Sequence, residues 1–202
     1  MVVTVDDNNF KAIANAIRGK NGTSETYKPS EMAAAIEAIN DGGVDFKNLI
    51  ESETTALTEI TIPEGVTKVR SYCFKDYTAL NTVHLPSTVL TIGEWAFSGC
   101  EALANINIPP KVARINERAF HQCYAIKKLV LPASLKTLEA FAFGWCNSLI
   151  TVTFNSKPTT MKSSVFEYCV NLTTINVPWA EGEVAGAPWG ATKATINYNY
   201  VG

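Results

Sequence analysis

The sequence is dominated by an apolar pattern that returns every 23 residues from residue 57 onward. A leucine-type position is followed three residues later by a second apolar position, and two residues after that by a third. The leucine-type position is held by Leu57, Leu80, Leu103, Ile126, Leu149 and Leu172. A fixed period of this length is typical of a solenoid, in which each unit buries its apolar edge against its neighbours.

Each copy of the repeat predicts two short extended segments and a turn. The second and third apolar positions predict a strand, for example over residues 59–62 and 105–108. Proline then ends that strand in every copy except the fifth, where Asn155 stands. A second extended segment and a short helical turn carrying Ala-Phe are expected to follow. Stacked in register, the first strands predict a parallel sheet of six rungs, spanning roughly 30 Å.

The end of each copy reads Ala-Phe-x-x-Cys or a close variant. The phenylalanines should cover the inner face of the sheet, and they are Phe97, Phe120, Phe143 and Phe166. The cysteines of this position are Cys100, Cys123, Cys146 and Cys169. Their shared register and parallel side-chain directions favour buried free thiols over disulfides. Zinc is disfavoured too, because no C-x-x-C pair is present and the histidines do not cluster with the thiols.

Charge and composition exclude several classes of function. The formal net charge is −2 and the pI is about 5.7, so broad nucleic-acid binding is not expected. The sequence contains no run of about 18 apolar residues, so no membrane-spanning helix is expected. The start of the sequence has no basic segment followed by an apolar core, which predicts that no signal peptide is present. Reduced thiols without an export signal predict folding in a cytoplasm.

Four segments are predicted along the chain. Residues 1–42 carry two helical patterns and are expected to serve attachment or oligomerisation. Residues 43–56 form a hinge and an N-terminal cap, and residues 57–180 hold the 23-residue repeats. Residues 181–202 form a C-terminal cap, in which Trp189 takes the phenylalanine position. A terminal strand is expected over residues 194–200, with Tyr198 and Tyr200 at its apolar positions.

No catalytic set emerges from the sequence. Phosphate-binding, dinucleotide-binding, zinc-protease and serine-hydrolase motifs are absent. His84 and His121 are predicted to be exposed surface residues without a nucleophile and carboxylate beside them. The protein is therefore predicted not to be an enzyme, and no catalytic, cofactor-binding or metal-binding residue is assigned.

Two surfaces of the solenoid are candidates for binding. The outward strand positions are polar and short, which suits a glycan or a protein strand, although an ordinary solvated sheet also explains them. Aromatic residues recur on the turn side, where they could stack on sugars, bury against another subunit or simply pack between coils. The candidate binding residues are Thr61, His84, Asn105, Asn107, Lys128, Val130, Thr153 and Asn176 on the strands, and Tyr72, Trp95, Tyr124, Phe141, Trp145 and Tyr168 on the turns.

The repeat unit L-x-x-I-x-I-P-x-x-V-x-x-I-x-x-x-A-F-x-x-C resembles the leucine-rich repeat of the BspA type. This resemblance covers residues 57 to about 180 and implies a parallel solenoid with a binding or scaffolding role. Proteins of this type are usually adhesion or interaction modules.

The N-terminal string IANAIRGKNGTSETYKPSEMAAAIEAI resembles a motif of tail and minor structural proteins of phages and prophages of Gram-positive bacteria. The ending APWGATKATINYNY resembles the tails of the same proteins. These resemblances imply a tail-associated protein that resides in the virion after cytoplasmic synthesis. Its partners would be other tail subunits or a host-surface glycan or protein, and a homo-oligomer is a further form that it could take. A bacterial cell-surface adhesin and an intracellular scaffold are the alternatives.

Overall fold

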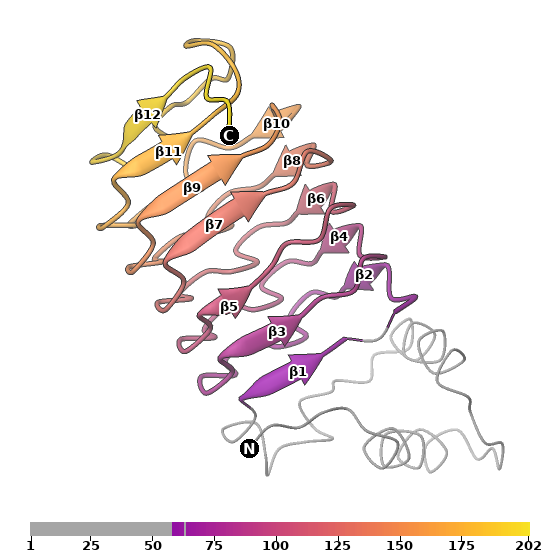
Figure 1. The fold of residues 1–202 in the computed structure, drawn as a ribbon. Coiled ribbons are helices and arrows are strands. Elements are labelled where there is room, and N and C mark those ends of the chain that lie inside the picture. The colour runs from indigo at the N-terminus through magenta and orange to yellow at the C-terminus, as the bar shows by residue number, and fades with distance from the viewer. Residues whose placement is uncertain (1–57, 63) are drawn as a thin grey trace, which may run out of the picture.

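A computed structural model describes residues 58–62 and 64–202, and these form a solenoid of stacked coils (Figure 1). The predicted N-terminal helices, the hinge and the leading cap lie outside the described residues. Two rows of short parallel strands run along the stack. The first row contains β1 (Glu59–Thr61), β3 (Thr82–His84), β5 (Asn105–Ile106), β7 (Lys128–Leu131), β9 (Thr151–Phe154), β11 (Thr174–Asn176) and β12 (Thr195–Asn197). The second contains β2 (Lys68–Val69), β4 (Thr91–Ile92), β6 (Arg114–Ile115), β8 (Thr137–Leu138) and β10 (Thr160–Met161).

The pairing register confirms the 23-residue period. Ile60 pairs with Val83 in the first row, and Val69 pairs with Ile92 in the second. Because equivalent residues stack directly on one another, the inward side chains form continuous columns and the outward ones form continuous rows. The second row is a single sheet of five strands.

The prediction of one six-rung sheet was wrong for the first row. That row is divided into the sheet β1-β3-β5 and the sheet β7-β9-β11-β12, with no strand pairing between β5 and β7. Elsewhere the third and fourth coils remain joined, since β6 pairs with β8 and the Phe120 N–H donates to the Ala142 carbonyl at 2.8 Å. The interruption is therefore confined to the first row of strands.

The predicted helical turns were also wrong, because no helix occurs in the described residues. Alternate N–H groups of each turn donate to the next coil instead of along their own backbone. In the first copy the N–H groups of Tyr72, Phe74 and Asp76 donate to the carbonyls of the following coil at 2.9, 2.8 and 2.7 Å. Tyr72 and Asp76 adopt left-handed φ angles of 64° and 65°. This alternation turns the N–H groups toward the neighbouring coil, which an α-helix cannot do.

The core is built from the predicted columns. Phe97, Phe120, Phe143 and Phe166 are buried and stack at centroid separations of 5.2, 5.1 and 6.0 Å. Cys100, Cys123, Cys146 and Cys169 are buried free thiols, as the repeat register predicts, while Cys73 is half-buried. In the first copy the buried Tyr77 takes the cysteine position.

The end of the solenoid departs from the predicted register. A strand does lie within residues 194–200, but Ile196 pairs with Ile175. The last coil is therefore 21 residues long rather than 23, and Tyr198 and Tyr200 do not take the strand positions predicted for them. Trp189 is buried, and its carbonyl accepts the Phe166 N–H at 2.9 Å, the bond that Val165 accepts from Phe143 one coil earlier. Its ring packs against Phe154 and Trp179.

Candidate functional site

The first strand row presents a polar surface, whose best-defined part lies over β1, β3 and β5. Along each strand, side chains two residues apart point to the same face of the sheet. Because the strands are in register, the outward side chains of one coil lie beside the equivalent side chains of the next. On these three coils the outward residues are Glu59, Thr61, Thr82, His84, Asn105 and Asn107. We refer to this set as the strand-face cluster.

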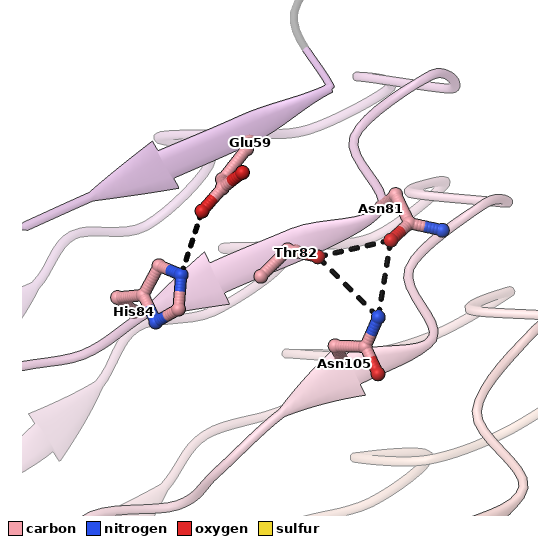
Figure 2. Close-up of polar contacts among 5 residues, drawn as sticks. All are labelled: Glu59, Asn81, Thr82, His84 and Asn105. Atoms are coloured by element: carbon pink, nitrogen blue, oxygen red, sulfur yellow. Dashed lines mark hydrogen bonds and ion pairs between the residues drawn. The ribbon is translucent and has the colours of Figure 1, made fainter. Parts of the chain in front are cut away.

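A hydrogen-bonded histidine–carboxylate pair links β1 to β3 within this cluster. The Nε2 atom of His84 lies 2.8 Å from Oε1 of Glu59 (Figure 2). Both side chains are partly open to solvent, so the pair adds little to stability. It does hold the imidazole ring across the strands. The sequence places both residues at outward positions of neighbouring copies, but only His84 was among the candidate binding residues.

A second network joins β3 to β5. Figure 2 shows Asn81, Thr82 and Asn105 bonded to one another. The Asn105 Nδ2 donates to Asn81 Oδ1 at 3.1 Å and to Thr82 Oγ1 at 3.4 Å, and Thr82 Oγ1 donates to Asn81 Oδ1 at 2.9 Å. These bonds fix the Asn105 amide and leave its Oδ1 atom facing away from them. Asn81 is a functional candidate that sequence reasoning did not single out, and Thr82 was predicted only to be an outward position of the sheet.

A shallow depression lies over these two strands. Its volume is about 400 Å³, and it is lined by Thr82, Val83, His84, Leu85, Ala104, Asn105, Ile106 and Asn107. It lies beside the interruption between β5 and β7. Within the described part of the chain, the Asn107 side chain has no hydrogen-bond partner, so its whole amide group is available to a ligand.

The remaining strand-face candidates divide into exposed and covered residues. Thr61, Lys128 and Val130 are exposed, and Thr153 is half-buried. Asn176 is buried at 7% exposure, which corrects its assignment as a binding residue. Its Nδ2 donates to Thr153 Oγ1 at 3.2 Å, and its Oδ1 accepts from Asn197 Nδ2 at 2.7 Å. The last strand thus covers Asn176 and satisfies its amide.

One column of turn aromatics packs along the coils. The rings of Tyr72 and Trp95 stack at 6.3 Å with an interplanar angle of 12°. In the third copy the same repeat position holds Arg118, whose guanidinium lies 4.9 Å from the Trp95 ring centre and 5.0 Å from that of Phe141. Glu94 accepts hydrogen bonds from Trp95 Nε1 at 3.1 Å and from the Tyr72 hydroxyl at 3.4 Å. These partners favour packing between coils over ligand binding for this column.

The other turn aromatics lie at later positions of the repeat. Trp145 and Tyr168 lie 4.6 Å apart between ring centres and are 39% and 51% exposed. Tyr124 is half-buried at the end of the third copy. The structure therefore divides the turn candidates into a column with Tyr72, Trp95 and Phe141, in which Tyr72 on the first coil is itself 53% exposed, and an exposed pair at Trp145 and Tyr168.

Burial keeps three thiols of the described core neutral. Burial raises the pKa of the Cys100 thiol from 9.0 to about 12 and raises the pKa of Cys123 and Cys146 well above their ordinary value. Burial and the nearby Arg118 lower the pKa of His121. The prediction that His121 is a surface residue was wrong: it is half-buried, and its Nδ1 atom is buried without a partner. Its ring packs 5.8 Å from that of Trp95.

A search for other kinds of site covered residues 58–62 and 64–202. Within these ranges, His, Cys, Asp and Glu side chains nowhere gather in a group of three that could hold a metal ion. The same residues contain no helix with the length and apolar character needed to span a membrane.

Comparisons with solved structures find other leucine-rich repeat proteins. The Treponema pallidum leucine-rich repeat protein is 29% identical, with a TM-score of 0.61 over 71% of this chain and 70% of its own. A leucine-rich repeat protein from Bacteroides ovatus is also 29% identical, with a TM-score of 0.52 over 59% of this chain and 31% of its own. The pneumococcal vaccine antigen PcpA, at 18% identity, a TM-score of 0.55 and coverage of 71% and 42%, shares the fold alone. No curated protein sequence matches the chain.

The family comparison agrees with the repeat seen in the sequence and in the strands. The model for the BspA type leucine-rich repeat region matches residues 50–173 in six copies. The match extends over more than half of the 202 residues. It ends before the buried Trp189 and the strand β12, which close the stack. The chain therefore belongs to the BspA type leucine-rich repeat family.

Proposed function

We propose that this protein is a non-enzymatic binding protein that engages its partner through the first strand row. The observation that carries the proposal is the strand-face cluster over β1, β3 and β5. Its side chains are polar and most are exposed, and bonds between coils hold four of them in place, those of Glu59, His84, Thr82 and Asn105. A prearranged polar surface loses less conformational entropy when it binds than a mobile one does. The solenoid fold of this family is typically a binding scaffold, which supports the same role.

The turn side has a different role in this proposal. The column formed by Tyr72, Trp95, Arg118 and Phe141 stabilises the stack, because each member already contacts a neighbour. The exposed Trp145 and Tyr168 are the turn residues best placed to contribute to binding. An aromatic pair of this kind suits a sugar ring or an apolar side chain of a partner.

The more specific proposal is a tail-associated protein of a phage or prophage of Gram-positive bacteria. It is supported by the resemblances of residues 13–39 and of the C-terminal 187–200 segment to proteins of that class. In this role the N-terminal segment would attach the protein to the particle, and the repeats would contact another tail subunit or the host surface. A bacterial cell-surface adhesin is the second candidate, supported by the family to which the repeats belong.

Binding to intact cells tests the general proposal. Fluorescently labelled full-length protein would be titrated onto Gram-positive cells and onto purified cell walls. Saturable binding is expected, and Asn107→Lys combined with Thr61→Lys should abolish it, since both substitutions place long charged side chains on the strand face. The matched control is Thr91→Lys combined with Thr137→Lys on the second strand row, which should leave binding unchanged.

The outcomes of this titration are distinct. Equal loss of binding in both double variants would show that the strand face has no special role. Binding that persists in both would place the contact elsewhere on the molecule. Circular dichroism and urea unfolding of each variant would establish that the solenoid remains folded.

Particle fractionation tests the tail proposal separately. After prophage induction in a host that encodes this protein, the protein should sediment with intact tails and be labelled on them by specific antibodies. Recovery in the wall fraction of uninduced cells, with none on particles, would favour the adhesin and contradict the tail role.

A further inference from the structure

We propose that the depression over β3 and β5 is a binding site for a neutral saccharide. This inference rests on the proposed binding function and specifies the class of ligand. The site is formed by His84, Asn105 and Asn107, with Thr82 and Asn81 as positioning residues. Its volume of about 400 Å³ lies near the lower end of the range for small-molecule sites and suits roughly one or two sugar rings.

The free polar atoms of the site match sugar hydroxyls. Asn105 uses its Nδ2 within the protein and leaves Oδ1 as an acceptor. Asn107 offers both an acceptor and two donor hydrogens. His84 uses Nε2 toward Glu59 and leaves Nδ1 for a ligand. A sugar hydroxyl both donates and accepts, so a saccharide can satisfy this mixed set of groups.

The local charge disfavours an anionic ligand. The Glu59 carboxylate lies beside His84 at the edge of the depression, and none of the eight lining residues is a lysine or arginine. A carboxylate or phosphate at this position would lie close to Glu59 without a cation to offset the repulsion. Amide, hydroxyl and imidazole groups are instead suited to a neutral polar ligand.

The backbone of β3 offers no place for a peptide strand. A peptide that joins a sheet needs an unpaired strand edge. β3 is paired on both sides, by β1 and by β5, so its backbone groups are already used, whereas β5 pairs only with β3. The part of the depression over β3 must therefore recognise a ligand through side chains, and a peptide at the β5 edge is the alternative that the test below includes.

The network in Figure 2 supplies the preorganisation that a weak ligand needs. The Asn105 amide is held by two acceptors, Asn81 Oδ1 and Thr82 Oγ1, and the His84 ring is held by Glu59. Fixing these groups before the ligand arrives reduces the entropy lost on binding. Asn176, which occupies the repeat position of Asn107 three coils later, cannot do the same, because its amide is buried and satisfied.

Side-chain amide resonances of the full-length protein test this inference. ¹⁵N-labelled protein would be titrated to millimolar levels with maltotriose, lactose and N,N′-diacetylchitobiose. At least one of these saccharides should shift the Asn105 and Asn107 side-chain resonances in a saturable manner. Asn107→Ala should weaken that binding about fivefold, the effect of losing roughly one hydrogen bond. Thr137→Ala, on β8 in the second strand row and outside the depression, should have no effect.

Two further probes distinguish the alternatives, namely a hyaluronan tetrasaccharide as an anionic sugar and a short neutral peptide. Shifts at Asn105 and Asn107 caused only by one of these, or by none of the five probes, would overturn the inference. So would neutral-sugar binding that Asn107→Ala leaves unchanged, with Asn107→Lys as a second variant at that position. If the saccharides fail while cell-wall binding still depends on the strand face, the binding function stands and only the ligand class is wrong.

Discussion

At the scale of single residues, the repeated cysteine fills space and also donates a hydrogen bond. The Sγ atoms of Cys123 and Cys146 lie 3.2 and 3.3 Å from the carbonyl oxygens of Phe97 and Phe120 in the preceding coil. Sequence reasoning explained these residues as small apolar side chains. The thiol donor gives a further reason for cysteine at this position, since alanine would fill less space and donate nothing.

The buried thiols predict a loss of stability at alkaline pH. Their pKa values are raised in the folded protein, to about 12 for Cys100, so the unfolded chain releases these protons first. Below pH 9 the buried thiols should make their full contribution to the free energy of unfolding. As the pH rises from 9 toward 12, the free energy of unfolding should fall by about 1.4 kcal/mol per pH unit for each thiol. Urea unfolding at several pH values would measure this slope. Cys146→Ala should reduce the pH dependence of the unfolding free energy. An unchanged slope would contradict the raised pKa of this buried thiol.

Arg118 predicts a second residue-scale effect. Arg118→Met keeps the length of the side chain but removes the charge between the Trp95 and Phe141 rings. A loss of about 1–2 kcal/mol in unfolding free energy is expected. Arg114→Met is the control, because its 3.7 Å contact with Glu139 is largely exposed and should contribute less than about 0.5 kcal/mol. Equal losses in the two variants would contradict a stabilising role for the contacts of Arg118 with Trp95 and Phe141.

At the scale of elements, the turns connect the coils as strongly as the strands do. The turn N–H groups donate to the next coil, so the backbones of adjacent coils lie close together in the turns. A Cβ atom at Gly93 would lie 2.3 Å from the Ser71 backbone nitrogen and 2.4 Å from the Arg70 carbonyl carbon. Neither backbone atom can move without displacing the preceding coil.

Gly93→Ala should therefore be costly although alanine is small. We expect a loss of about 2–3 kcal/mol in unfolding free energy, from overpacking against the backbone. Asn116→Ala is the matched control, because Asn116 occupies the same repeat position one coil later and already carries a Cβ atom. Chemical denaturation of both variants checks the prediction, and a neutral Gly93→Ala would contradict the close approach.

The sequence predicted the strands better than the turns, for physical reasons. Alternating apolar residues such as Val83 and Leu85 indicate a strand directly, and a fixed period aligns the strands. The Ala-Phe pair is compatible with a helical turn and with the turn that the structure shows. Its spacing indicates which side chains are buried, but it does not indicate the direction of the backbone N–H groups. The left-handed conformations of Trp95 and Trp145 have no sequence signature, since such positions usually favour glycine or asparagine.

The same reasoning explains which parts of the candidate site were found. His84, Asn105 and Asn107 follow from outward strand positions, whereas Asn81 precedes the strand and joins the cluster only through its side chain. Burial of Asn176 depends on β12, whose register differs from the period because the last coil is two residues shorter. Period alone could not predict that change.

At the scale of the whole molecule, the C-terminal end is closed by tryptophans. Trp189 packs 6.2 Å from Trp179 and 6.4 Å from Phe154, and both tryptophans are buried. A solenoid needs such a cap because each coil is covered only by its neighbours. The cap thus replaces the coil that would otherwise follow.

Trp189→Ala should destabilise the molecule from that end. A loss of about 3–5 kcal/mol is expected. Hydrogen exchange should accelerate first in β11 and β12 and last in β3 and β4, because coupling passes only between adjacent coils. Trp145→Ala, on an exposed turn residue, should change exchange much less. Uniform acceleration along the chain would contradict this local capping role.

The central claim is that the strand face binds and the packed turn column does not. Hydrogen exchange of the full-length protein, with and without purified Gram-positive cell wall, tests this most directly. The account predicts that wall material slows exchange at residues 82–85 and 104–107 and leaves residues 94–98 unchanged. Protection confined to residues 94–98, or no protection in either region, would contradict it.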